Sequence, residues 1–426
     1  MSDTPFHNNT EKKKERAVLC GLAAACFAPG ESSTDVSMAE LAALVETAGG
    51  EPVAFLVQNR AAPDPRSFIG VGKEEELRAL ISANDCDLVV FDNELSPSQM
   101  RVLSEDLKVK VMDRSGLILD IFAQRARTKE GQLQVELAQY KYLLPRLLGM
   151  WTHLERQEGA IGTRGPGETQ LESDRRHIRR KIQKLESELA EVRKNRATQR
   201  RRREKNEMPT VALVGYTNAG KSTLLNRLTG SDIPANDRLF DTLDTTTRRM
   251  MLDEVQEILL SDTVGFIRKL PTHLIEAFKA TLEELQYADV LLHVIDMSSE
   301  EWRSQAEIVD TLIAQLGAEN TPCIRVYNKC DVCADLLPQE HDAVCISAKT
   351  GEGVDALLRM ISEKLGRGRR QAVFLIPYDK GALVQLLHDE AAVLSLEYAE
   401  NGTRIEAVVK PELWARVAAY AEEIRT

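Results

Sequence analysis

The chain has 426 residues, of which 43% are hydrophobic and 28% charged, and its formal net charge is −11. This length allows roughly two to four domains, and the composition is that of a multidomain protein that folds in water. The acidic balance argues against nucleic acid as a partner of the chain as a whole, and no apolar stretch has the length of a membrane span.

Residues 1–16 are polar, and we expect a disordered tail there. The next stretch, "EKKKERAVLCGLAAACFAPG", resembles a signal peptide, because a basic cluster precedes an apolar run. We interpret the run from Ala17 to Ala25 as a buried first strand instead. From residue 17 to 127 apolar strands alternate with helical stretches, which predicts a mostly parallel sheet with helices on its faces. Ser96-Pro97 is a typical helix start in this domain.

Residues 128–206 predict a long helical hairpin, because apolar residues step by three and four in two stretches. The two seams contain Leu133, Leu137, Tyr140, Leu144 and Leu147, and then Leu171, Ile178, Ile182, Leu185, Leu189 and Val192.

Pro145 is expected to kink the first helix of the hairpin. The connection "QEGAIGTRGPGETQ", 157–170, contains four glycines and a proline and is predicted to be irregular. It is either a flexible turn or an RNA-contacting loop with Arg164 at its tip.

The second helix of the hairpin has the opposite charge from the rest of the chain. Between Arg175 and Lys205, fourteen Lys or Arg stand against four Glu, a local charge of +10 that leaves about −21 elsewhere. Such a block is suited to binding phosphates.

Residues 207–369 form a second predicted α/β domain, from the strand "TVALVG" to the helix "GVDALLRMISEKLG". Residues 370–426 predict a small βαββα domain with a hairpin turn at Asn401-Gly402 and a final helix "PELWARVAAYAEEI". The predicted fold class is therefore α/β and multidomain.

"GYTNAGKST" matches the phosphate loop G-x-x-x-x-G-K-[ST] between a strand and a helix. Its N–H groups wrap phosphates, Lys221 spans the β and γ groups, and Ser222 ligates Mg²⁺. The residues of this loop are Gly215, Tyr216, Thr217, Asn218, Ala219, Gly220, Lys221, Ser222 and Thr223.

Two further motifs identify the base. In "NKCD" the carboxylate of Asp331 accepts two hydrogen bonds from guanine, which adenine does not offer, so GTP is predicted over ATP. In "SAK" a backbone N–H is expected to meet the guanine oxygen. The predicted base-binding residues are Asn328, Lys329, Asp331, Ser347, Ala348 and Lys349.

Two switch segments complete the pattern. "DTVG" comprises Asp262, Thr263, Val264 and Gly265. Asp262 is expected to hold Mg²⁺ through water, and the Gly265 N–H to sense the γ-phosphate. In "TLDTTTRRM" we choose Thr246 as metal ligand, with Thr247 as the close alternative. The predicted catalytic groups are those of Lys221, Thr246 and Gly265, and the direct metal ligands are Ser222 and Thr246.

Seven cysteines, an odd number, indicate reduced thiols rather than a disulfide framework. Cys330, Cys333, His341 and Cys345 have spacings that resemble a zinc knuckle. We reject zinc, since Cys330 lies inside a base-reading motif and Cys345 inside a predicted buried strand.

These motifs resemble a translation-factor-class GTPase, and "FIGVGK" at 68–73, "GTRGPGETQLE" at 162–172 and "GYTNAGKST" together resemble the HflX family. The resemblance runs from residue 17 through nearly the whole chain. It implies a cytoplasmic GTPase that binds GTP, GDP and Mg²⁺, binds the large ribosomal subunit, and splits or rescues stalled ribosomes under stress. One departure is Thr245, where the family pattern has proline. We expect a monomer without membrane insertion.

Phe266 follows "DTVG" where many GTPases have a glutamine that orients water. The resemblance implies that other groups position the water, and that Asn218 helps to hold a potassium ion; otherwise Asn218 is an ordinary loop residue. Hydrolysis should then be slow alone and stimulated by the ribosome. The alternatives are a GTP-gated RNA-modifying or assembly factor, and a membrane or protease regulator without an RNA role.

Overall fold

The structure is a computed structural model that describes residues 14–27, 32–155, 166–205, 208–231, 239–240, 246–252, 257–270, 274, 285–333, 340–366, 370–409 and 411–425. Most of the predicted tail, and Arg164 at the hairpin tip, lie outside the described residues. Within the described part, no helix is both long enough and apolar enough to cross a bilayer.

The N-terminal domain is a four-stranded sheet in the order β2-β1-β3-β4, and every pair is parallel, as predicted. Its elements are β1 (Arg16–Ala24), α1 (Asp35–Ala48), β2 (Glu51–Arg60), α2 (Val71–Ala83), β3 (Leu88–Phe91), α3 (Pro97–Leu107), β4 (Lys110–Asp113) and α4 (Arg114–Arg125). The predicted start of α3 is confirmed, because Ser96 and Gln99 form a capping box and Pro97 occupies the first turn.

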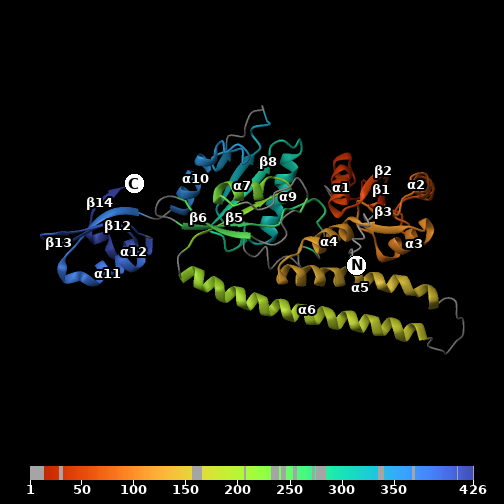
Figure 1. Cartoon of the computed structure of the whole chain (residues 1–426), viewed down its shortest axis with the longest axis horizontal. Coiled ribbons are helices and arrows are strands. Elements are labelled where there is room, and N and C mark those ends of the chain that lie inside the picture. Colours follow the sequence, from red (N-terminus) through yellow and green to blue (C-terminus); the bar gives the residue numbers. More distant parts are fainter. Residues whose placement is uncertain are drawn as a thin grey trace, which may run out of the picture.

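The helical hairpin consists of α5 (Lys129–Glu155) and α6 (Pro166–Lys205), which run side by side. Helix α5 lies along the N-terminal domain, and the longer α6 continues beneath the central domain (Figure 1). Their seam contains the predicted residues Leu133, Leu137, Leu185 and Leu189, with Tyr140, Ile182 and Val192 packed against them. The prediction of irregular structure to residue 170 is wrong, since α6 already begins at Pro166. A proline suits the first turn of a helix because its missing N–H has no intrahelical partner there.

The central domain is a six-stranded sheet in the order β10-β9-β8-β5-β7-β6, parallel except for β6. Its elements are β5 (Thr210–Gly215), α7 (Lys221–Thr229), β6 (Thr246–Met251), β7 (Glu257–Asp262), β8 (Val290–Asp296), α9 (Trp302–Gln315), β9 (Cys323–Asn328), β10 (Ala343–Cys345) and α10 (Val354–Gly366). The phosphate-loop, "DTVG", "NKCD" and "SAK" motifs all lie at the carboxyl edge of this sheet, after β5, β7, β9 and β10.

The C-terminal domain is an antiparallel sheet in the order β12-β13-β11-β14 with two helices. Its elements are β11 (Arg370–Ile376), α11 (Gly381–Glu390), β12 (Ala392–Ala399), β13 (Gly402–Val409), α12 (Pro411–Val417) and β14 (Ala421–Arg425). The hairpin turn is at Glu400-Asn401, one residue before the predicted pair.

The predicted final helix of this domain is too long. It ends at Val417, and the chain continues as β14, which pairs with β11. Strand pairing covers an edge of β11 that would otherwise expose backbone groups, and this tertiary gain outweighs local helix propensity. The domain is therefore βαββαβ.

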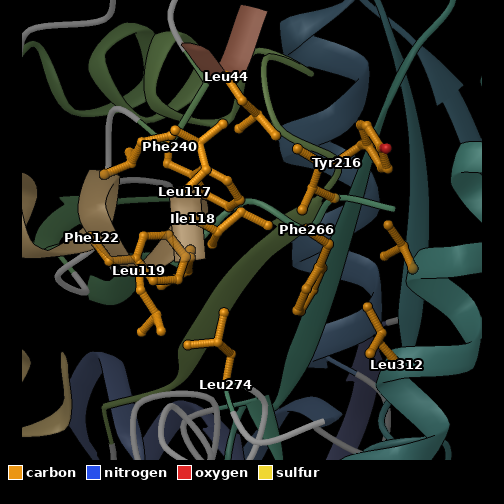
Figure 2. Close-up of a cluster of buried hydrophobic side chains, with 14 of the residues drawn as sticks. Leu44, Leu117, Ile118, Leu119, Phe122, Tyr216, Phe240, Phe266, Leu274 and Leu312 are labelled. Atoms are coloured by element: carbon orange, nitrogen blue, oxygen red, sulfur yellow. The ribbon is translucent and has the colours of Figure 1, made fainter. Parts of the chain in front are cut away.

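One apolar cluster joins the N-terminal and central domains. Figure 2 shows Phe266 of the central domain together with side chains from α1 and α4. Its labelled members are Leu44, Leu117, Ile118, Leu119, Phe122, Tyr216, Phe240, Phe266, Leu274 and Leu312. The two domains thus share one core, and the segment after "DTVG" lies in it.

Candidate nucleotide-binding site

The loop between β5 and α7 depends on two glycines. A Cβ atom at Gly215 would lie 2.3 Å from the carbonyl oxygen of Val294, so no side chain fits there. Gly220, which caps α7, has φ +94°, a left-handed conformation that favours glycine. These glycines let the chain turn tightly into α7, whose first N–H groups then face the end of the sheet.

Lys221 is the first residue of α7 and is buried. Its Nζ atom donates hydrogen bonds to the carbonyl oxygens of Gly215 at 3.1 Å and Tyr216 at 2.8 Å, so the ammonium lies over the loop. Burial lowers the pKa of Lys221 to about 8, and the nearby Asp262 opposes this shift. Among the described residues no acid accepts a hydrogen bond from this buried cation, which is therefore suited to receive phosphate oxygens.

Asp262 ends β7 and is buried, and its Oδ2 atom accepts a hydrogen bond from the Ser222 hydroxyl at 2.7 Å. Thr246 pairs with Asp262 across β6 and β7, while the Thr247 hydroxyl lies 3.2 Å from that of Ser261. Paired residues share a face of the sheet, so Thr246 is on the Asp262 face and Thr247 is not. The hydroxyls of Ser222 and Thr246 and the carboxylate of Asp262 form an oxygen donor set that suits Mg²⁺.

Asn328 connects the base-reading motif to the phosphate loop. Its Nδ2 atom donates to the Ala219 carbonyl oxygen at 2.8 Å, and its Oδ1 atom accepts from the Ala348 N–H at 2.9 Å. We predicted that a backbone N–H of "SAK" meets the guanine oxygen, and the N–H of Ala348 is bonded to Asn328 here. The side chains of Asp331 and Lys349 are exposed beside this buried contact.

Hydrogen bonds also hold the residues that follow Asn328 and precede Ala348. Lys329 donates to Asp296 at 2.7 Å, and Ser347 is buried and accepts the Thr350 N–H. Cys330 and Cys333 donate to backbone carbonyls of Tyr327 and Met297.

The "DTVG" segment folds onto the phosphate loop through its backbone. The Phe266 N–H donates to the Gly215 carbonyl at 3.1 Å, and the Thr217 N–H donates to the Phe266 carbonyl at 2.7 Å. A Cβ atom at Gly265 would lie 2.9 Å from Thr217 and 3.1 Å from the Lys221 Nζ atom. Gly265 therefore approaches the loop as only glycine can.

Several predicted side chains do not face the loop. The Thr263 hydroxyl donates to the Leu213 carbonyl oxygen at 2.7 Å, and Val264 belongs to the shared apolar cluster. The Tyr216 hydroxyl donates to Glu40 of the N-terminal domain. Asn218 is exposed, with φ +62°. For Thr263, Val264 and Tyr216, a role in nucleotide binding would have to come from the backbone.

Sequence reasoning missed the residues that meet this site from the N-terminal domain. Asp92 accepts a hydrogen bond from Lys269, which follows "DTVGF" closely, and Glu40 meets Tyr216. A signal for Asp92 was present, since it directly follows the buried strand β3, at the carboxyl edge of a parallel sheet where ligands and partners are usually bound. Nothing in the sequence pointed to Glu40.

Four family models match consecutive parts of the chain. They are described as GTP-binding GTPase N-terminal at residues 35–123, GTP-binding GTPase Middle Region at 125–203, 50S ribosome-binding GTPase at 210–329, and HflX C-terminal domain at 336–411. These matches follow the order of the domains in the structure.

Curated relatives match over most of their length. The chain is 47% identical to GTPase HflX of Caldanaerobacter subterraneus subsp. tengcongensis, over 95% of this chain and 94% of that protein. It is 45% identical to GTPase HflX of Escherichia coli, over 85% of this chain and 87% of that protein. A solved GTP-binding protein of Sulfolobus solfataricus in complex with GDP is 24% identical, with a TM-score of 0.44, over 83% of this chain and 99% of that chain.

Proposed function

Since this chain belongs to the HflX family of GTPases, we propose that its GTP-bound form binds the large ribosomal subunit and dissociates or rescues ribosomes, under stress. The GTPase activity itself follows from the family and the phosphate-loop domain. We expect the protein to act in the cytoplasm as a monomer. The ribosomal role is supported by the family model described as a 50S ribosome-binding GTPase and by the surface of α6.

The observation that carries the ribosomal role is the charge on α6. Arg176, Arg179, Arg180 and Lys184 are exposed, whereas Leu185 and Leu189 of the same helix are buried against α5. Lys181 is already paired with Glu136 of α5 at 3.1 Å. An exposed row of mainly arginine is suited to bidentate contacts with RNA phosphates. A membrane-surface helix would need an exposed apolar face, and the apolar seam of α6 is used by α5.

Nucleotide control is assigned to the groups that converge on the phosphate loop. Ser222 and Thr246 would hold Mg²⁺ directly and Asp262 through water, and the ion would neutralise charge on the β- and γ-phosphates. The Gly265 N–H would contact the γ-phosphate. GTP would then order both switch segments and favour the subunit-bound state, and hydrolysis would release it.

Hydrolysis of GTP is expected to be slow without a partner. Lys221, Thr246 and Gly265 would stabilise and position the γ-phosphate, but Phe266 is buried in the shared core and cannot orient water. The large subunit would order the switch segments. The exposed position of Asn218 would let its amide oxygen help to hold K⁺ as a further positive charge.

Co-sedimentation with purified ribosomal subunits tests this function. The full chain is mixed with large subunits, small subunits or anionic vesicles, each with a non-hydrolysable GTP analogue or GDP. We expect pelleting with large subunits in the analogue and much less in GDP, and loss of the 70S peak in a gradient when the analogue is added to intact ribosomes. Pelleting with vesicles alone would contradict the proposal in favour of a membrane regulator. Binding to immature subunits only would favour an assembly factor.

A further inference from the structure

Two acidic residues of the N-terminal domain reach into the GTPase domain. Asp92, the residue after β3, accepts a hydrogen bond from the Lys269 ammonium, and Glu40 of α1 accepts one from the Tyr216 hydroxyl. Arg114 pairs with both acids, with its Nη1 atom 2.8 Å from Asp92 Oδ1. Two cations and two anions thus balance one another across the domain boundary.

Burial makes this network costly to leave incomplete. The side chains of Asp92, Arg114 and Lys269 are 0%, 2% and 10% exposed. Burial alone would raise the pKa of Asp92, but Arg114 and Lys269 outweigh it and lower this pKa. Ser33 also donates to Asp92, at 2.7 Å. Loss of one partner would leave a buried charge uncompensated, so the network strongly favours one docked arrangement of the two domains.

The network lies at the position where sheets of this kind bind ligands. In the sheet order β2-β1-β3-β4, the chain leaves β1 towards β2 on one side and leaves β3 towards β4 on the other side. The two connections therefore diverge at the carboxyl ends of β1 and β3. In open parallel sheets this divergence opens a crevice for ligands. Here the Lys269 ammonium meets Asp92 at this edge of the sheet. The GTPase domain therefore supplies the group that the N-terminal sheet holds at this point.

Tyr216 contacts Lys221 of the phosphate loop directly, and Lys269 follows Gly265 by four residues. The Tyr216 hydroxyl accepts the Arg268 N–H at 2.9 Å, and the Tyr216 carbonyl accepts a hydrogen bond from the Lys221 ammonium at 2.8 Å. Between these contacts Phe266 forms a backbone bridge with Tyr216. The segment from Gly265 to Lys269 is thus held to the loop at one end and to the N-terminal domain at the other.

We propose that Glu40 and Asp92 are positioning residues for GTP hydrolysis. They hold Tyr216 and Lys269, and through them the Lys221 ammonium and the Gly265 N–H keep the spacing that the γ-phosphate requires. Neither acid touches the nucleotide. The N-terminal domain is therefore part of the hydrolytic apparatus, and the rate of hydrolysis depends on how the two domains are docked.

Two variants of the full chain test this inference. Tyr216→Phe removes only the hydroxyl, and Lys269→Met removes the charge while keeping an apolar stem. Single-turnover GTP hydrolysis is measured without ribosomes and normalised to the sites that bind GDP, so misfolded protein does not count. We expect kcat to fall by about ten- to a hundredfold, as for other losses of positioning. The Kd for GTP should change by less than about threefold, the pattern of a contact that acts in the transition state.

Matched controls separate positioning from folding. Tyr142→Phe removes a hydroxyl that donates to buried Asp113 of the N-terminal domain at 2.7 Å, and Lys110→Met removes a surface pair with Glu15. Both should keep kcat. Lys269→Arg should regain most of the activity lost in Lys269→Met. The losses in Asp92→Asn and Lys269→Met should be less than additive in the double variant, because both break the contact between Asp92 and Lys269, although Asp92→Asn also weakens the pair with Arg114. Unchanged kcat in Tyr216→Phe and Lys269→Met, or additive effects of Asp92→Asn and Lys269→Met, would overturn the proposal.

Discussion

Asn328 packs against Gly220 so closely that a Cβ atom at Gly220 would lie 2.2 Å from the Asn328 Nδ2 atom. The same Nδ2 atom donates to the carbonyl oxygen of Ala219. The residue that begins the base-reading motif is therefore in direct contact with the phosphate loop. One connected unit would therefore hold the two ends of a bound nucleotide, and a change in either segment should affect both.

Gly220→Ala should strongly weaken nucleotide binding. The new methyl group would displace the Asn328 amide, and alanine at φ +94° carries a further penalty of about 1–2 kcal/mol. We expect GTP and GDP affinity to fall by at least about a hundredfold, which corresponds to a loss of about 2.8 kcal/mol. Titration with fluorescent GDP measures this loss. Gly230→Ala is the control, because φ is +64° there but nothing lies within 4 Å of the new methyl group. Equal affinities in the two variants would contradict the close contact.

Asp331→Asn should remove the preference for guanine. The side chain is exposed and available to the base, and each charge-assisted hydrogen bond contributes about 1.5–3 kcal/mol. Loss of the acceptor pair should lower GTP affinity by about two orders of magnitude or more. Competition between GTP and ATP for a fluorescent nucleotide gives the readout. Asp355→Asn, an exposed acid in the first turn of α10, should bind GTP normally. Full GTP affinity in Asp331→Asn would remove this residue from the base site.

The ammonium of Lys221 should make nucleotide binding depend on pH. Burial lowers its pKa from 10.5 to about 8, so between these values the unfolded chain binds more protons than the nucleotide-free protein. The contribution of Lys221 to the free energy of unfolding, without nucleotide, should therefore rise with pH from about 8 to 10.5. This stabilising contribution is lost as pH falls through about 8.

Bound phosphates favour the charged ammonium and raise its pKa again. Above about pH 8, GTP binding should take up a proton, and affinity should fall by up to about tenfold per pH unit. Calorimetry at about pH 8.5 in two buffers of different protonation enthalpy measures the uptake. Lys221→Arg does not titrate in this range and should show no uptake. A Kd that is constant to about pH 9.5 would show that the ammonium is not the titrating group.

Subunit binding should lose part of its salt dependence when the α6 arginines are neutralised. Arg176, Arg179 and Arg180 are exposed, and each phosphate contact contributes about 0.7–0.9 to the slope of log K against log salt. Replacing all three by Gln should flatten the slope by about two to three. Gln at the exposed positions Arg303, Arg359 and Arg404 removes the same charge from other elements and should leave the slope unchanged. If both triple variants gave the same slope of log K against log salt, the α6 arginines would not contact RNA phosphates.

The parts of this structure that sequence reasoning reached are those in which a local pattern fixes the geometry. The spacing from Gly215 to Ser222 places a phosphate loop between a strand and a helix, because few other residues allow that turn. The seam of α5 and α6 followed from its period. Each feature depends on residues close in sequence.

The parts that were missed depend on how distant elements dock. The Asp92 contact with Lys269 joins residues 177 positions apart, and no spacing rule predicts such a pair. β14 was assigned to a helix because its strand character comes from pairing with β11. The sequence predicted that Phe266 does not act on water, but it did not predict the place of Phe266 in a core shared by two domains.

This location of Phe266 changes what its removal should do. The side chain is 1% exposed and packs with residues of α4, so Phe266→Ala should leave a cavity and lower the free energy of unfolding by about 3–5 kcal/mol. Phe266→Leu fills most of that space and should lose less. GTP affinity should stay nearly constant in both, since the side chain lies in the core and only its backbone meets the loop. Chemical denaturation and nucleotide titration separate the two effects, and a large loss of affinity without loss of stability would contradict this placement.

The large subunit should supply what Phe266 does not. The free protein has Lys221, Ser222 and Asp262 in place. The side chain of Phe266 cannot hold the attacking water, so hydrolysis should be slow. Subunits that order the switch segments should raise single-turnover hydrolysis by about 10³-fold or more, as trans-acting groups do for other GTPases. Phe266→Ala should lower this stimulated rate, because the loosened segment is harder to order. Each rate is measured with and without purified large subunits, in potassium and again in sodium. Fast hydrolysis that ignores subunits would rule out a partner-completed site, and equal rates in both salts would remove the potassium role of Asn218.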